Sequence, residues 1–133
     1  MTFTSARIIT ADINRLVNFY QEITGFPAAR YNEDFAEFRT PVAVLAIGSA
    51  RTLQLFGGES VATPSTNRSV ILEFLVDDVD AHYGRLAAYL GKALVQEPTT
   101  MPWGNRSLLF RDPDGNLVNF FTPVTPEAAA RAR

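Results

Sequence analysis

Apolar and polar residues in the first part of the chain follow the period of a strand and then that of a helix. A short β-prone run covers residues 7–10, and Asp12 follows two residues later. Apolar side chains then recur three and four residues apart, at Ile13, Leu16, Val17 and Tyr20. An aspartate directly before such a stripe is a typical helix N-cap, and Gly25 is a typical stop. The pattern predicts a strand followed by a capped amphipathic helix.

Three more strands are predicted after this helix, at Phe35–Arg39, Val42–Ile47 and Thr52–Phe56. Apolar runs at these places are separated by turn-forming residues. The stretch 58–68 has no periodicity and is rich in Gly, Ser, Thr and Pro, which is typical of a linker. The order of elements up to residue 57 is therefore βαβββ.

The same order begins again after the linker. Val70–Val76 is predicted to be a strand, and Asp78 caps a second helix that ends at Gly91. A shift of 66 residues superposes Asp12 on Asp78, with apolar helix positions following in both copies. Agreement of this kind indicates an internal repeat of one module.

A tight turn is predicted near the end of the second module. Residues 111–116 read Arg-Asp-Pro-Asp-Gly-Asn and lie between the apolar runs 108–110 and 117–121. Proline fixes φ, aspartate can bond the backbone ahead of it and glycine tolerates positive φ, so the segment favours a hairpin. A shift of 65 residues places 53–56 on 118–121. This second match predicts that 53–56 is the closing strand of the first module.

Composition limits the classes of partner. The chain has 133 residues, 47% of them hydrophobic, which suits one ordinary domain. A formal charge of -2 supplies no field that attracts a polyanion, so nucleic acid is not an expected partner. The absence of cysteine excludes disulfides and thiolate metal sites. With no apolar run of signal or membrane-spanning length, a cytoplasmic location without membrane contact is expected.

Three segments together resemble one known superfamily. They are Pro102–Val118, Asp12–Tyr20 and Val76–Asp80, and they are similar to sequences of the vicinal oxygen chelate superfamily, which contains glyoxalases, bleomycin-resistance proteins and extradiol dioxygenases. The resemblance implies an α+β fold in which two tandem βαβββ modules form a curved mixed sheet around a groove. Residues 1–133 would be a single domain, with module one at about 4–57, module two at about 69–123 and a tail at 124–133.

The resemblance also implies where a metal would be bound. Catalytic members carry His, Glu or Gln at four positions, on the first and last strands of each module. Counting from the helix caps and the closing strands, these positions are Ser5, Gln54, Ile71 and Asn119. None is His, Asp or Glu, whereas a catalytic divalent ion usually needs three or more imidazole or carboxylate donors. No metal and no cofactor is therefore expected, and the chain is closest in character to the metal-free bleomycin-resistance branch.

Glu73 is the one candidate catalytic residue. It lies two positions after Ile71, on the same strand face, and could be a displaced ligand or a general base. The shift of 66 pairs it with Arg7, and an ion pair between the two side chains is the favoured hypothesis. His82, the single histidine, is expected to be a partly exposed helix residue.

Aromatic and neutral polar side chains are expected to line the groove. The predicted ligand-binding residues are Gln54, Phe56, Asn119, Phe121, Phe35, Phe38, Phe110, Trp103 and Arg106. Such a lining suits a flat, largely apolar molecule held by stacking and a few hydrogen bonds. Trp103, between Pro102 and Gly104, could stack on the ligand, and core packing of the indole is the alternative.

Two functional hypotheses follow. The first is sequestration of an aromatic antibiotic or natural product in a metal-free groove, giving drug resistance or self-protection. The second is a vicinal oxygen chelate enzyme, a lyase, isomerase or dioxygenase, in which Glu73 could act as acid or base. An accessory protein without a physiologically important ligand remains a third possibility. The dimers of the superfamily imply a homodimer with two equivalent sites.

Overall fold

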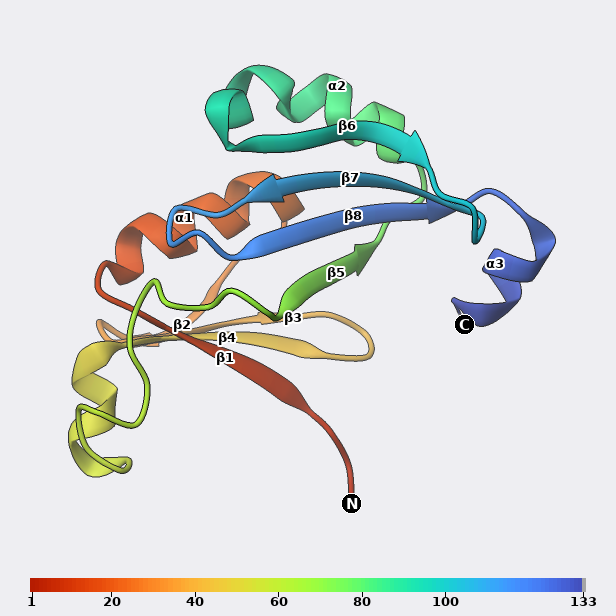
Figure 1. The fold of residues 1–133 in the computed structure, drawn as a ribbon. Helices are drawn as coiled ribbons and strands as arrows, with labels where there is room; N and C mark the ends of the chain where they lie inside the picture. Colours follow the sequence, from red (N-terminus) through yellow and green to blue (C-terminus); the bar gives the residue numbers. More distant parts are fainter. Residues whose placement is uncertain (133) are drawn as a thin grey trace. The chain divides into compact units, whose positions relative to one another are not determined.

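The computed structural model describes residues 1–132, which form two compact units, residues 1–67 and residues 68–132. Each unit contains a mixed sheet and a long helix that packs on it (Figure 1). The predicted fold class, α+β with two tandem modules, is confirmed. No helix among the described residues is long and apolar enough to cross a membrane.

The first unit is a four-stranded sheet over residues 1–67. The elements are β1 (Ser5–Thr10), α1 (Ile13–Thr24), β2 (Ala29–Asn32), β3 (Phe35–Arg39), β4 (Val44–Ser49) and a 3-10 helix, η1 (Ala50–Leu55). The strand order is β1-β4-β3-β2. β4 is parallel to β1 and antiparallel to β3, so it has a neighbour on both edges.

Helix α1 begins and ends where the sequence predicts. The side chain of Asp12 accepts a hydrogen bond from the Arg15 amide at 3.1 Å, and Gly25 adopts a left-handed conformation with φ of 72°. Leu16, Tyr20 and Ile23 are fully buried, and α1 packs on β4. The apolar stripe in the sequence is therefore the face that covers the sheet.

The second unit repeats this arrangement. Its elements are β5 (Ile71–Leu75), α2 (Val79–Leu90), η2 (Gly91–Ala93), β6 (Leu94–Thr100), β7 (Asn105–Arg111), β8 (Leu117–Pro123) and α3 (Pro126–Arg131). The strand order over residues 68–132 is β5-β8-β7-β6, with β5 and β8 parallel. Asp78 caps α2 through the Ala81 amide at 3.1 Å.

The predicted turn between β7 and β8 is confirmed. Asp112 Oδ1 accepts hydrogen bonds from the amides of Asp114 and Asn116, each at 2.9 Å, and Asp112 is only 5% exposed. Gly115 has φ of 86°, which a residue with a Cβ rarely adopts. The aspartate thus satisfies backbone donors that a hairpin end would otherwise leave unpaired.

The prediction of a strand at Thr52–Phe56 is wrong, because this segment belongs to the 3-10 helix η1 and the turn after it. Thr52 Oγ1 donates to the Ser49 carbonyl at 2.7 Å, and the amides of Phe56 and Gly58 both donate to Leu53 O. Such local bonds compete with strand pairing. The neighbouring strand β4 is already paired with β1 and β3, so no edge remains beside it for 52–56.

The first unit closes with β4 and not with residues 52–56, and this changes the spacing of the repeat. β2, which carries no clear periodicity, is the strand missing from the sequence-based order, and β4 is the true closing strand of the first unit. Strand pairing sets Ser5 beside Val44 and Ile71 beside Leu117. The helix caps therefore repeat after 66 residues, but the closing strands repeat after 117 minus 44, or 73, residues and not after 65.

Candidate functional site

Each sheet has one face that its helix covers and one that it does not, which we call the helix-free face. Side chains alternate between the two faces along a strand, and residues that are paired across neighbouring strands lie on the same face. On the helix-free face of the first unit lie Ser5, Arg7, Glu37 and Ala46. On that of the second unit lie Ile71, Glu73, Leu109, Asn119 and Phe121.

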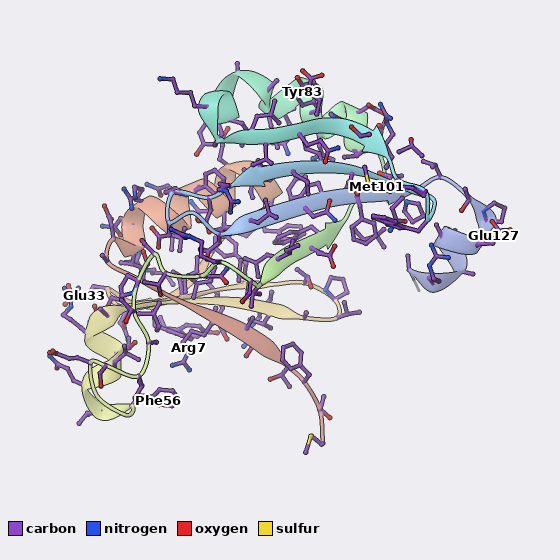
Figure 2. The ribbon with its side chains drawn as sticks, in the orientation of Figure 1. Arg7, Glu33, Phe56, Tyr83, Met101 and Glu127 are labelled. Carbon is purple, nitrogen blue, oxygen red and sulfur yellow. The ribbon has the colours of Figure 1, made fainter. Side chains whose placement is uncertain are left out.

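Arg7 forms a cluster with two aromatic rings on the helix-free face of the first unit. Its guanidinium carbon lies 5.2 Å from the ring centroid of Phe35 and 4.9 Å from that of Phe56. Arg7 and Phe56 are labelled in Figure 2. We call Arg7, Phe35 and Phe56 the Arg7 cluster. A Cβ at Gly48 would lie 3.2 Å from Thr52 Oγ1, which is tight, and 3.6 Å from Arg7 Cδ, which is an ordinary van der Waals contact. A cation over π-faces is attracted by the ring quadrupoles.

A second polar group lies on the same sheet. Glu37 accepts hydrogen bonds from Tyr31 Oη and Arg39 Nη2, each at 2.8 Å. The Glu37 side chain is only 15% exposed, against 62% for Arg39. The carboxylate is thus held by two donors, and it neutralises the arginine next to it.

The second unit carries a carboxylate where the first carries Arg7. Asn119 Nδ2 donates to Glu73 Oε2 at 2.9 Å. Because a carboxylate only accepts, the amide must turn its nitrogen toward Glu73, and this fixes the position of Asn119 Oδ1. Asn119 is 8% exposed, and its Oδ1 is buried without a hydrogen-bond partner among the described residues. The pair therefore combines an exposed carboxylate with a buried, unsatisfied acceptor.

At the positions that hold a metal in catalytic relatives, this chain has residues that do not suit a metal ion. Gln54 does not belong to this set, because it lies on η1, and the residue equivalent to Asn119 is Ala46 on β4. The four positions are then Ser5, Ala46, Ile71 and Asn119, of which two have no donor atom. Within residues 1–132 no group of three His, Cys, Asp or Glu side chains could hold an ion. This donor set is unsuited to a divalent cation.

Two of the predicted ligand-binding residues face the core instead. Phe38 and Phe110 are 1% and 0% exposed, and their rings pack against Tyr20 at 6.1 Å and Phe120 at 5.2 Å. Each lies one position from a residue of the helix-free face, so strand alternation turns its side chain toward the helix. Phe35 and Phe121, with the opposite parity, do lie on the helix-free faces.

Trp103 lies in the loop between β6 and β7, and its side chain is 59% exposed. Its carbonyl accepts a hydrogen bond from Arg131 of α3. Gly104 has φ of 92°, and a Cβ there would clash with Thr125 Oγ1 and approach Ala128 Cβ at 3.1 Å. The loop backbone is thus fixed against α3 while the indole remains accessible, and the core-packing alternative for Trp103 is wrong.

Arg106 is held by an acid of its own unit. Its Nε and Nη2 donate to the two carboxylate oxygens of Asp80 at 2.9 and 3.0 Å. This hydrogen bonding lowers the pKa of Asp80 and raises that of Arg106. A planar bidentate pair fixes the guanidinium in place. Contact of Arg106 with a ligand stays a prediction, and it would require the arginine to share its donors or lose this pair.

His82 is a partly buried residue of α2. Its ring packs edge-on against Phe120 with centroids 5.4 Å apart, and Arg85 Nη2 lies 3.0 Å from His82 Nδ1. Burial, and then the charge of Arg85, lower the pKa of His82. These contacts place the imidazole on the helix-covered side of the sheet.

The predicted ion pair of Arg7 with Glu73 joins the two units and stays a prediction. Within its own unit each side chain already has partners: two aromatic rings for Arg7, and an amide for Glu73. Sequence reasoning missed Ala46 because it predicted the closing strand at residues 52–56, and it missed the Glu37 group because Tyr31 lies on the unrecognised strand β2. The alternation Phe35-Ala-Glu-Phe-Arg was the signal that could have placed Glu37 on the face opposite Phe38.

Comparisons with known proteins cover nearly the whole chain. The sequence pattern of the Glyoxalase/Bleomycin resistance protein/Dioxygenase superfamily matches residues 2–120. Uncharacterized protein YwbC of Bacillus subtilis is 29% identical over 119 residues, which are 86% of this chain and 91% of that protein. A glyoxalase/bleomycin resistance protein/dioxygenase from Nocardioides is 25% identical, with a TM-score of 0.77 over 95% of this chain and 85% of that one. A protein of unknown function from Agrobacterium tumefaciens is 27% identical, with a TM-score of 0.78 over 92% and 94% of the two chains.

Proposed function

Since the chain belongs to the glyoxalase, bleomycin resistance protein and dioxygenase superfamily, we propose that it binds and sequesters a flat aromatic small molecule without a metal ion. An antibiotic or another natural product is the class of ligand, and resistance or self-protection is the consequence. Members of one superfamily can carry out unrelated chemistry, so the proposal rests on the residues of this chain.

One observation carries the proposal. Ser5, Ala46, Ile71 and Asn119 stand at the four positions where catalytic relatives bind a metal, and together they offer no imidazole and no carboxylate. The same strands nevertheless present groups that bind organic molecules, a guanidinium over two aromatic rings in the first unit and an acceptor pair in the second. Recognition groups without metal ligands favour binding over metal-dependent chemistry.

Stacking supplies the affinity in this proposal. Trp103 offers an accessible indole on a backbone that α3 holds in place, and Phe56 offers a ring that is 62% exposed. Rigid aromatic anchors lose little conformational entropy on binding. The superfamily resemblance implies a homodimer, which sedimentation or light scattering would test.

Fluorescence and metal analysis test the proposal directly. Trp103 is the single tryptophan of the chain, so a bound planar compound such as acridine is expected to quench its emission. By calorimetry, Trp103→Phe is expected to weaken binding severalfold and Trp103→Ala roughly tenfold or more, because aromatic stacking contributes about 0.5–1.5 kcal/mol beyond burial of area. Tyr89→Ala, which removes another half-exposed ring of the second unit, is the control.

Two results would contradict the proposal. Stoichiometric iron, zinc, manganese or nickel that survives dialysis of the purified protein would show that a metal is bound after all. Unchanged emission and no heat of binding across a broad panel of planar natural products would show that the protein does not bind this class of ligand.

A second candidate, a metal-independent enzyme, is favoured by the Glu73 carboxylate alone. The Asn119 amide holds one carboxylate oxygen at 2.9 Å, which orients the group as a general acid or base must be oriented. In that case a bound compound would be converted to product, and Glu73→Gln would retain binding while losing turnover. Mass spectrometry of ligand recovered from the protein separates this outcome from sequestration, in which the ligand returns unchanged.

A further inference from the structure

Glu73 and Asn119 form a hydrogen-bonded pair that leaves one buried acceptor without a partner. Asn119 is more than nine-tenths buried, and its Oδ1 has no hydrogen-bond partner among residues 1–132. An unpaired buried acceptor destabilises a folded protein, because it has lost its hydrogen bonds to water. Such exceptions in a folded protein call for an explanation, and one explanation is a partner supplied by a ligand.

The geometry fixes what kind of partner fits. Asn119 Nδ2 is committed to Glu73 Oε2 at 2.9 Å, so Asn119 presents its oxygen, and Glu73 presents a carboxylate that is itself exposed. Both of these oxygens can only accept hydrogen bonds. The complement must donate hydrogen bonds to both, and a positive charge strengthens a bond to a carboxylate.

The surroundings of this acceptor pair are apolar. Ile71 and Leu75 flank Glu73 on the same strand face and are 49% and 55% exposed, and Phe121 pairs with Leu75 across the β5–β8 ladder. Strand β7, which pairs with β8, carries Arg111 on this face, and Arg111 donates to the Gly115 carbonyl at 2.9 Å at the hairpin end. The acceptor pair is thus bordered by side chains that favour contact with a hydrocarbon or aromatic group.

We propose that the helix-free face of the second unit recognises an aromatic cation with N–H donors, such as an amidinium or guanidinium, through Glu73 and Asn119. The N–H groups donate to Glu73 Oε1 and Asn119 Oδ1, while the aromatic part lies on Ile71 and Leu75. Asn119, at a position that holds a metal ligand in catalytic relatives, then contacts an organic cation instead. This inference rests on the proposed function and adds the charge class of the ligand.

Four naphthalene compounds of matched ring size test the charge class. Calorimetry at pH 7 compares naphthalene-2-carboxamidine, naphthalene-2-carboxamide, naphthalene-2-carboxylate and 2-naphthyltrimethylammonium. The amidine is expected to bind roughly tenfold more tightly than the neutral carboxamide, with the carboxylate weakest, because charge-assisted hydrogen bonds are about twice as strong as neutral ones. The trimethylammonium compound carries the charge without N–H donors and is expected to bind more weakly than the amidine.

Variants assign the preference to the two residues. Glu73→Gln is expected to bring the amidine-to-carboxamide ratio close to one, and Asn119→Leu to weaken amidine binding severalfold. Glu97→Gln removes the same charge from an exposed glutamate of the second unit, which accepts from Tyr83 at 2.9 Å, and should leave the ratio unchanged. Thermal melting of each variant confirms that it is folded.

The outcomes separate the two claims. If all four compounds bind with similar affinity, or if the amidine preference survives Glu73→Gln, the charge-class inference is wrong while aromatic binding stands. Equal binding of the trimethylammonium compound and the amidine overturns the role of the N–H donors. If no naphthalene compound and no planar natural product binds at all, the proposed function fails and this inference fails with it.

Discussion

Phe38 in the first unit and Phe110 in the second occupy equivalent places, since each is the partner of a core residue on the closing strand, Leu45 or Val118. Both rings are fully buried beneath a helix. On the other face of the sheets the two units differ, because Arg7 and Glu73 are equivalent by position and opposite in charge. The helix-covered face must exclude water in both units, so its residues are constrained alike. The helix-free face is under no such constraint, and there the units differ in chemistry.

The largest expected effect tests whether the cores are alike. Phe38→Ala and Phe110→Ala should each lower the free energy of unfolding by about 3–5 kcal/mol, because each leaves a cavity in a packed core. Phe35→Ala, on the helix-free face of the same strand as Phe38, should cost clearly less. Urea titrations give the three values. A cost for Phe110→Ala as small as that for Phe35→Ala would contradict the equivalence of the cores.

The next effect distinguishes two glycines with the same backbone conformation. Gly58 and Gly104 have φ of 93° and 92°, but a Cβ has open space at Gly58 and clashes with Thr125 at Gly104. Gly58→Ala should cost about 1 kcal/mol from backbone strain alone, and Gly104→Ala should cost more by about 1–3 kcal/mol from overpacking. Equal costs in chemical denaturation would mean that α3 gives way without penalty.

A smaller effect concerns the Arg7 cluster. Arg7→Met keeps most of the apolar stem and removes the cation over Phe35 and Phe56, so stability should fall by about 0.5–1 kcal/mol. A double-mutant cycle with Phe56→Leu isolates the interaction, since Phe56 is the nearer ring at 4.9 Å. A coupling energy indistinguishable from zero would show that the rings and the guanidinium only lie close together.

The smallest effect is a pH dependence confined to the second unit. Hydrogen bonding to Arg106 lowers the pKa of Asp80 in the folded protein, so the unfolded chain binds the proton more readily. The stabilisation is therefore present above the unfolded pKa and is lost as the pH falls through the folded value. Asp80→Asn should lower the melting temperature slightly at pH 7, and the difference from the parent should vanish in acid. A difference that persists at low pH would point to a cause other than the ion pair.

Sequence reasoning succeeded where a signal depends on near neighbours. The Asp12 and Asp78 caps, the Asp112 turn and the stripe of α1 were all predicted, because each is decided within a few residues of the chain. It failed at 52–56, where an alternating pattern typical of a strand forms a 3-10 helix. An alternating segment forms a strand only when the edge of another strand is free for pairing, and both edges of β4 are already paired.

The candidate site was predicted in part for the same reason. Phe35, Phe121 and Asn119 lie on the helix-free faces and Trp103 is exposed, and contact of these residues with a ligand stays a prediction. Phe38 and Phe110, which were also predicted to line the groove, face the core. A shift of one residue in parity reverses the direction of a side chain. The face on which a side chain lies could be predicted reliably only where the strand and its partner were both recognised.

By itself the sequence determined the two modules, their helix caps and the hairpin, and the lack of imidazole and carboxylate at Ser5, Ile71 and Asn119. Only the tertiary structure decided that Ala46 is the fourth residue of that set, that Arg7 lies over two rings and that Asn119 turns its amide nitrogen to Glu73. Caps and turns are decided by bonds within a few residues. The neighbours of a side chain across a sheet depend on which strand pairs with which, and that choice is made by the packing of the whole unit.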